Sequence, residues 1–224
     1  MAQALATTLV VASLYALLGA GYVLVYRASR VLNLAQGDLL TLGGYFLFAT
    51  AATFPGAPVL ALPLAGGAVV STFDLVMVGA AVAFFAALFV FLKVSPLGIR
   101  MRAAGERALL ASQRGINFHG VFALSWALAA FAGGLAGMIY SSNVRLEPSL
   151  GILGLRAFAV ALVGGLDSLG GVVPAALLVA AVEVASVRWG NPLLSDVSPF
   201  LCLLVMLLVR PWGLFGTKEE LERV

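Results

Sequence analysis

The chain is a series of long apolar runs separated by short polar stretches. A helix needs about 20 apolar residues to cross the hydrocarbon core of a bilayer. Seven runs come near or reach that length: 5–26, 39–54, 75–92, 120–140, 152–166, 171–187 and 199–212. We therefore predict an all-α fold, a polytopic transmembrane helix bundle with about seven spans, in a single domain over residues 1–224.

Several of these spans are short. The run 152–166 holds 15 residues, which at the α-helical rise is about 22 Å against a hydrocarbon core of about 30 Å. Short or glycine-broken spans are tolerated where neighbouring helices or a wet cavity satisfy the backbone polar groups. We therefore expect the helices to surround a common interior.

Composition supports lipid as the solvent for much of the surface. Hydrophobic residues make up 62% of the 224 residues and charged residues 10%, whereas soluble domains carry roughly 25% charged residues.

The lone Cys202 offers no disulfide, and the lone His119 has no cluster of metal ligands beside it. No phosphate-binding Gly-x4-Gly-Lys-Ser/Thr motif and no nucleophile–base pair occurs. We expect no catalytic residues, no metal and no cofactor, so the chain is predicted not to be an enzyme.

The longest polar segment is 93–118, and within it 102–114 has the pattern of a short amphipathic helix ended by Gly115. Its apolar face consists of Ala104, Ala108, Leu109 and Ala111. Such a helix can dock into a groove on a partner or lie on anionic lipid headgroups. The pattern alone favours the lipid surface over the partner.

The distribution of Lys and Arg predicts the orientation, because these residues concentrate on the cytoplasmic side. With 93–118 in the cytoplasm, the N-terminus lies outside and the C-terminus inside. Ten basic residues are then cytoplasmic and three are outside: Arg27, Arg30, Lys93, Arg100, Arg102, Arg107, Arg114, Arg210, Lys218 and Arg223 against Arg145, Arg156 and Arg188. The first 26 residues lack Lys and Arg, which favours a retained span over a cleaved signal peptide.

A few polar residues sit at or inside the predicted spans. Asn33, Gln36 and Asp38 precede the second span, and an interfacial turn with Asp38 capping the helix explains them. Asp167 is expected to cap the sixth span in the same way. Glu183 lies in an apolar run, where a buried carboxylate is a functional candidate by default. An interfacial ion pair with Arg188 is an equally good explanation.

Four segments together resemble one protein family, the permeases of branched-chain amino acid ABC importers. Gly98–Asn117 resembles the cytoplasmic loop that contacts the ATPase in that family. The other three resemble family elements in the same order: Asn33-Leu34-Ala35-Gln36-Gly37-Asp38, Ala161-Leu162-Val163-Gly164-Gly165-Leu166-Asp167-Ser168-Leu169-Gly170-Gly171, and Arg210-Pro211-Trp212-Gly213-Leu214-Phe215-Gly216. The likeness is greatest to the shorter of the two paired permeases.

This resemblance implies a permease subunit of an ATP-driven importer of branched-chain or related amino acids in a bacterial-type plasma (inner) membrane. It implies three kinds of partner: a second permease subunit, cytoplasmic ATPase subunits and an extracytoplasmic substrate-binding protein. The expected ATPase-coupling residues are Arg102, Glu106, Ala108, Arg114, Gly115, Ile116 and Asn117. A route for apolar amino acids needs small or apolar walls and few polar groups. The expected pathway residues are Asn33, Gln36, Asp38, Gly133, Gly137, Gly164 and Gly165.

The chain departs from the family pattern at 55–73, where members carry a further helical hairpin and this sequence has a Pro- and Gly-rich loop or re-entrant stretch. Two alternatives therefore stay open. A self-contained secondary transporter or channel would have an internal repeat and ionisable groups near the bilayer midplane, and no convincing repeat is found. The second alternative is a shortened homologue that does not transport.

Overall fold

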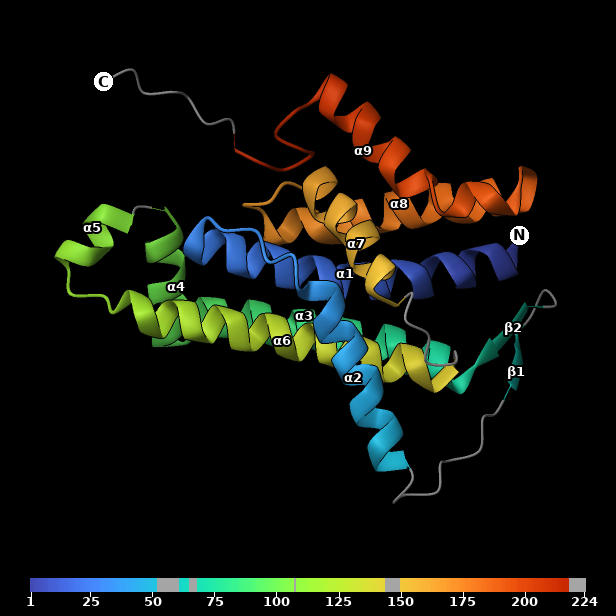
Figure 1. Cartoon of the computed structure of the whole chain (residues 1–224), viewed down its shortest axis with the longest axis horizontal. Helices are drawn as coiled ribbons and strands as arrows, with labels where there is room; N and C mark the ends of the chain where they lie inside the picture. Colours follow the sequence, from blue (N-terminus) through green and yellow to red (C-terminus); the bar gives the residue numbers. More distant parts are fainter. Residues whose placement is uncertain (52–60, 65–67, 107, 144–149, 218–224) are drawn as a thin grey trace.

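The computed structural model describes the chain apart from residues 52–60, 65–67, 107, 144–149 and 218–224. The described part is a helix bundle with one small β-hairpin (Figure 1). Its elements in order are α1 (Ala2–Ser29), α2 (Gln36–Ala51), β1 (Ala61–Leu64), β2 (Ala68–Ser71), α3 (Thr72–Val94), α4 (Pro96–Glu106), α5 (Ala108–Gln113), α6 (Phe118–Asn143), α7 (Leu150–Gly164), α8 (Leu169–Trp189), η1 (Pro192–Ser195) and α9 (Ser198–Val209). The predicted helical class is confirmed.

The number of spans is not confirmed. Four described helices are long and apolar enough to cross a membrane, namely α1, α3, α6 and α8. Two shorter apolar helices, α7 and α9, have 15 and 12 residues. The predicted second span corresponds to α2, which has 16 residues and spans only about 24 Å at the α-helical rise.

Helix α1 is the centre of the bundle and packs against α3, α6, α7 and α8 (Figure 1). Its sequence is apolar on all sides, which is the pattern of a helix that lies in a protein core or spans a membrane, and its buried residues lie between Ala12 and Val25. Leu17, Leu18 and Val23 have no exposed surface. Gly19 lets α8 approach, since a Cβ there would lie 2.8 Å from Val172 Cγ1.

Glycines bring α2 into backbone contact with its neighbours. Gly137 of α6 lies directly against the Leu40 carbonyl group, and a Cβ at that position would overlap it. On the other side, a Cβ at Gly37 would lie 2.6 Å from the Gly151 carbonyl oxygen of α7. The spacing of Gly133 and Gly137 in α6 therefore lets the backbones of α6 and α2 pack closely, as small residues do in other membrane helices.

The segment predicted as a loop or re-entrant stretch at 55–73 contains the antiparallel hairpin β1–β2, with Leu62 opposite Val70; residues 55–60 and 65–67 of it lie outside the described part. The Val69 N–H donates to Gln3 Oε1 at 2.8 Å, which ties the hairpin to the start of α1. A capping box formed by Ser71 and Asp74 then begins α3. The described part of this segment therefore contains strands where the family pattern has two helices.

The helix predicted over 102–114 is wrong in its bounds. Two helices, α4 and α5, occupy 96–113, with Arg107 between them outside the described residues. Pro96 begins α4 because its fixed φ suits the first helical turn. Ala104 and Ala111 are buried against this chain's own helices. These two residues are therefore not available to a partner's groove, contrary to the expectation.

Candidate functional site

Three of the four family-like segments meet at one end of the bundle, which we call the basic end. It consists of the C-terminal turn of α1, the helices α4 and α5, the α7–α8 turn and residues 210–217, and it lies at the left of Figure 1. Gly105 of α4 contacts the α1 terminus, because a Cβ there would lie 3.1 Å from the Arg27 carbonyl oxygen. The N-terminus and the β-hairpin lie at the opposite end.

The α7–α8 turn and the chain's last described residues form one unit. The Leu214 N–H donates to the Val163 carbonyl oxygen at 2.8 Å, and the Phe215 N–H to that of Gly164 at 3.1 Å. These bonds satisfy carbonyls at the C-terminus of α7, which have no partner within their own helix. Gly165 has a φ of +100° and would clash with Gly216 if it carried a Cβ, so this position requires glycine.

Asp167 holds the C-terminal segment instead of capping α8. Its Oδ2 accepts a hydrogen bond from the Thr217 N–H at 3.0 Å and another from the Thr217 hydroxyl. Ser168 caps α8, since its Oγ accepts from the Gly171 N–H at 3.1 Å. The prediction that Asp167 is the cap is therefore wrong by one residue. The Asp167 carboxylate instead binds Thr217, which lies 50 positions further along the chain.

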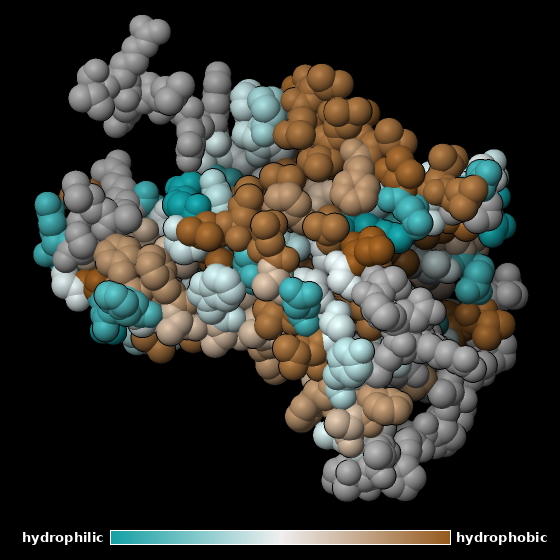
Figure 2. Space-filling model, in the orientation of Figure 1, coloured by the Kyte–Doolittle hydropathy of each residue, from teal (hydrophilic) through white to brown (hydrophobic). Residues whose placement is uncertain are grey.

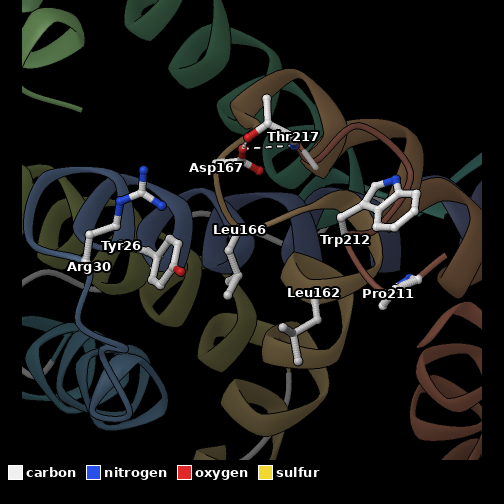
Figure 3. Close-up of a pocket in the computed structure, with 8 residues that line it drawn as sticks. All are labelled: Tyr26, Arg30, Leu162, Leu166, Asp167, Pro211, Trp212 and Thr217. Atoms are coloured by element: carbon white, nitrogen blue, oxygen red, sulfur yellow. Dashed lines mark hydrogen bonds between the residues drawn. The ribbon is translucent and has the colours of Figure 1, made fainter. Parts of the chain in front are cut away.

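A cavity of about 320 Å³ opens beside this unit (Figure 3). Arg30 and Tyr26 of α1 stand on one side and Trp212 with Pro211 on the other. The Arg30 guanidinium lies 5.6 Å from the centre of the Tyr26 ring, a cation–π arrangement. The basic end is thus hollowed where α1 faces the C-terminal segment.

The predicted coupling residues lie on α4, α5 and the turn into α6. Glu106, Arg114, Gly115 and Asn117 are exposed, Arg102 and Ile116 are half-buried, and the side chain of Ala108 lies outside the described residues. Gly115 has a φ of +76° with open space around it, which confirms the predicted left-handed end. The side-chain amide of Asn117 accepts a hydrogen bond from the Gly120 N–H at 3.3 Å and so stabilises the start of α6.

The predicted interfacial turn before α2 is wrong for two of its three polar residues. Asn33 and Gln36 are buried, with 1% and 0% of their surface exposed, whereas Asp38 is exposed in the first turn of α2. Asn33 Nδ2 donates to Gln36 Oε1 at 3.0 Å, and Gln36 Nε2 donates to the Ala129 carbonyl oxygen of α6 at 3.0 Å. These bonds form an internal polar link between helices.

The glycines predicted to line the route lie at helix contacts. Gly133 and Gly137 face α2, where they accommodate Gln36 and the Leu40 backbone, and Gly164 faces Gly171 across the α7–α8 turn. In this conformation these positions are filled by backbone and by Gln36. Their role in the pathway stays a prediction.

An ionic cluster at the other end of the bundle, with Glu183 at its buried side, was not predicted. Glu183 of α8 accepts hydrogen bonds from the Tyr15 hydroxyl at 2.7 Å and from Arg156 Nη1 at 3.3 Å. Arg156 Nη2 also lies 2.5 Å from Asp196 Oδ1. The partner of Glu183 is thus Arg156 of α7 and not Arg188, the residue that sequence proximity suggested.

Residues 66–210 match the family model described as the permease component of the branched-chain amino acid transport system. The chain belongs to this family. The match runs from the β-hairpin to the end of α9 and includes α4, α5 and the α7–α8 turn. The family resemblance seen in the sequence is thereby confirmed, and the described fold is that of a multi-pass membrane protein with four long apolar helices in its described part.

Curated relatives point to the same family as the family model does. The high-affinity branched-chain amino acid transport system permease protein LivH of Salmonella typhimurium and of Escherichia coli K12 is 35% identical over 143 residues, which is 62% of this chain and 45% of each relative. The corresponding BraD protein of Pseudomonas aeruginosa is 34% identical over 142 residues, or 61% of this chain and 45% of the relative. The matched stretch spans about half the length of these transport permeases. No solved structure matches the chain.

Proposed function

We propose that the chain is the permease subunit of an ATP-driven importer of branched-chain or related amino acids in a plasma (inner) membrane. It pairs with a second permease, binds cytoplasmic ATPases and receives substrate from an extracytoplasmic binding protein. The observation that supports this most is the family match over residues 66–210, because it includes the segment expected to contact the ATPase. The relatives' names supply the substrate class.

The basic end offers a route for coupling. Helix α4 rests on the end of α1 through Gly105 and on α3 through Gly98, where a Cβ would lie 2.6 Å from Leu92 Cα. A force applied to α4 and α5 by a closing ATPase is therefore transmitted to α1, the central helix. ATP binding shifts the bundle only if it favours one conformation over the other, and a helix packed this tightly cannot move independently.

The surface that meets the ATPase consists of α5 and the turn after it. Among the described side chains of this surface, Leu110 is an apolar one, 47% exposed, and Gln113, Arg114 and Asn117 are exposed polar residues. This replaces the apolar face proposed from the sequence, two of whose alanines are covered. Glu106 and Arg102 lie on the adjoining helix and flank the same surface.

The basic end faces the cytoplasm in this proposal, so the N-terminus is outside. Arg27, Arg30, Arg102, Arg114 and Arg210 are at that end, whereas Arg156 and Arg188 are at the other; Arg107, Arg145, Lys218 and Arg223 lie outside the described residues. Single cysteines at Gln113 and at Gln3, in a Cys202→Ser background, test this in oriented vesicles. A membrane-impermeant thiol reagent should label only Gln3→Cys from outside, and labelling of only Gln113→Cys would reverse the orientation.

The substrate route runs beside α2, where Asp38 is the single charged residue of the helix. Small residues and a few hydrogen-bonding groups make a suitable wall for an apolar amino acid. Because backbone fills the glycine contacts in this structure, transport requires α2 to separate from α6 or α7. The hydrogen bond from Gln36 to the Ala129 carbonyl oxygen then keeps the start of α2 attached to α6 while the far end of α2 moves.

ATP-dependent uptake of labelled leucine by the reconstituted assembly tests the function. Gly115→Ala is the decisive variant, because a side chain at a left-handed position costs about 1–2 kcal/mol, while the space there is open. Gly120→Ala is the matched control, since its Cβ would make only ordinary contacts with Asn117, at 3.9 and 4.0 Å, and the position lies in a helix. Uptake should fall several-fold in Gly115→Ala alone. Equal uptake by both variants would remove this turn from the coupling element.

A further inference from the structure

A second cavity, of about 270 Å³, lies between the N-terminal half of α1 and the C-terminal half of α8, at the end opposite the basic end. Val11 of α1 and Val184 and Val187 of α8 form its apolar wall. Glu183 and Arg188 supply one acidic and one basic side chain to the same cavity. It therefore combines charges of both signs with branched aliphatic side chains.

The acidic side of this cavity is a carboxylate that shares its cation with a second carboxylate. Glu183 and Asp196 both bind the guanidinium of Arg156, and the Asp196 side chain is 69% exposed. Glu183 is 9% exposed, and at such a position a carboxylate interacts with a charged ligand more strongly than it would in water. Each oxygen of a carboxylate can accept more than one hydrogen bond, and each Glu183 oxygen has one protein donor. The site can therefore accept a cationic donor.

The basic side is one helical turn further along α8. Arg188 is in the last turn of the helix and is exposed. A guanidinium presents a planar set of donors that fits a carboxylate. The two charged groups thus border one cavity from successive turns of the same helix, with Val184 and Val187 between them in sequence.

We propose that this cavity is an outer binding site for an aliphatic α-amino acid in its zwitterionic form. The ammonium group lies against Glu183, the carboxylate against Arg188, and the side chain against the valines. Ligand pockets generally measure roughly 300–1,000 Å³, so this one suits a small molecule and excludes a peptide. The inference rests on the proposed function, because it names the place where the permease first holds its substrate.

The test is equilibrium binding of labelled leucine to the purified permease in phosphatidylcholine nanodiscs. Arg188→Gln should weaken binding at least 10-fold, since it removes the charged hydrogen-bond donor of the ligand's carboxylate. The affinity of Arg188→Lys for leucine should lie between those of Arg188→Gln and the unmodified protein. Arg210→Gln, at the basic end, should bind leucine as the unmodified protein does. Isopentylamine and 4-methylpentanoate, which each keep one of the two charges, should compete at least 10-fold less well than isoleucine.

Several results would overturn the inference. The inference fails if leucine binding is not saturable or if Arg188→Gln binds leucine as well as the unmodified protein does. It also fails if isopentylamine competes as well as isoleucine. Nanodiscs containing phosphatidylethanolamine provide a further arm: if that lipid abolishes leucine binding, a headgroup ammonium occupies the cavity instead. Glu183→Gln should also lose binding, while normal binding by it would contradict the ammonium assignment.

The transport assay separates this inference from the proposed function. Normal ATP-driven leucine uptake without leucine binding to the isolated permease rejects the cavity alone. Leucine binding at the cavity without uptake of any branched-chain amino acid by the full assembly rejects the transport proposal instead.

Discussion

Helices α1 and α3 are both long and apolar, yet they occupy opposite environments. In the most apolar window of α1, 78% is buried within the chain, whereas the corresponding figure for α3 is 33%. The more hydrophobic of the two is α3, and it is the more exposed. In Figure 2 hydrophobic surface likewise covers α9, whose Val205 and Leu208 are 60% and 79% exposed. Hydropathy therefore identifies membrane helices here without telling which one is central.

The difference between the two helices lies in small and polar residues. Lipid tails are as apolar as leucine, so close packing and hydrogen bonds decide which membrane helices associate. Helix α1 has Gly19 and Gly21 against its neighbours, and its Tyr22 hydroxyl donates to the Gly154 carbonyl oxygen at 2.9 Å. Helix α3 presents side chains such as Val82 and Val90, 65% and 60% exposed, outward.

The largest effect should come from enlarging a glycine of α1. A Cβ at Gly21 would overlap the buried Gln36 amide, whereas one at Gly79 of α3 meets nothing within 4 Å. Gly21→Leu should lower the midpoint of thermal unfolding, measured by fluorescence-detected size exclusion, or prevent folding, because overpacking costs about 1–3 kcal/mol or more. Gly79→Leu should leave the midpoint unchanged. Equal loss in both would mean that α3 is also packed against protein.

The next largest effect is expected at the ionic cluster that holds α1 to α7 and α8. Arg156→Ala leaves Glu183 without its cation and should cost at most about 3 kcal/mol, the lower end of the range for a fully buried pair, because Arg156 also reaches the exposed Asp196. The same thermal measurement should show a clear loss of stability. Arg188→Gln, on the exposed end of α8, serves as the control and should change stability by less than about 0.5 kcal/mol. A stable Arg156→Ala variant would show that solvent reaches Glu183.

A smaller effect should follow from removing one hydroxyl of α1. Tyr22→Phe deletes the donor to the Gly154 carbonyl group and should cost about 0.6–1 kcal/mol. Tyr45 of α2 is 55% exposed, and Tyr45→Phe should cost nothing measurable. Comparing the two unfolding midpoints in one detergent isolates the interhelical hydrogen bond, and identical midpoints would mean that it adds no stability.

The smallest effect is expected on the outward face of α3. Val82→Ala should change stability by less than about 0.5 kcal/mol, as surface substitutions do, and should leave uptake unchanged. A loss of uptake with unchanged stability of the isolated chain would contradict the assignment of this face to lipid. It would show that the second permease covers α3.

Sequence patterns predicted much of this fold. The apolar runs locate the helices to within a few residues in the clearest cases, such as α6, predicted over 120–140 and observed over Phe118–Asn143. The family-like segments were recognised without structure, and the left-handed Gly115 follows from its place after a helix. These features are local, so local sequence determines them.

Features that depend on distant partners were missed. Gln36 was expected at an interface, yet its amide binds a carbonyl group 93 positions away in α6. One of the two explanations offered for Glu183 was an ion pair with Arg188 on its own helix, but its partner is Arg156, 27 positions before it. No spacing rule relates such residues, because helix packing alone brings them together. The link between residues 163–165 and 213–216 was missed for the same reason.

That last link bears on how the chain is made. The carbonyl groups of Val163 and Gly164 receive their hydrogen bonds from Leu214 and Phe215. Residues 213–216 follow α9 in the chain, so α7, α8 and α9 must all have been synthesised before these hydrogen bonds can form. The hydrogen-bonded end of α7 therefore forms only after α9 has been made.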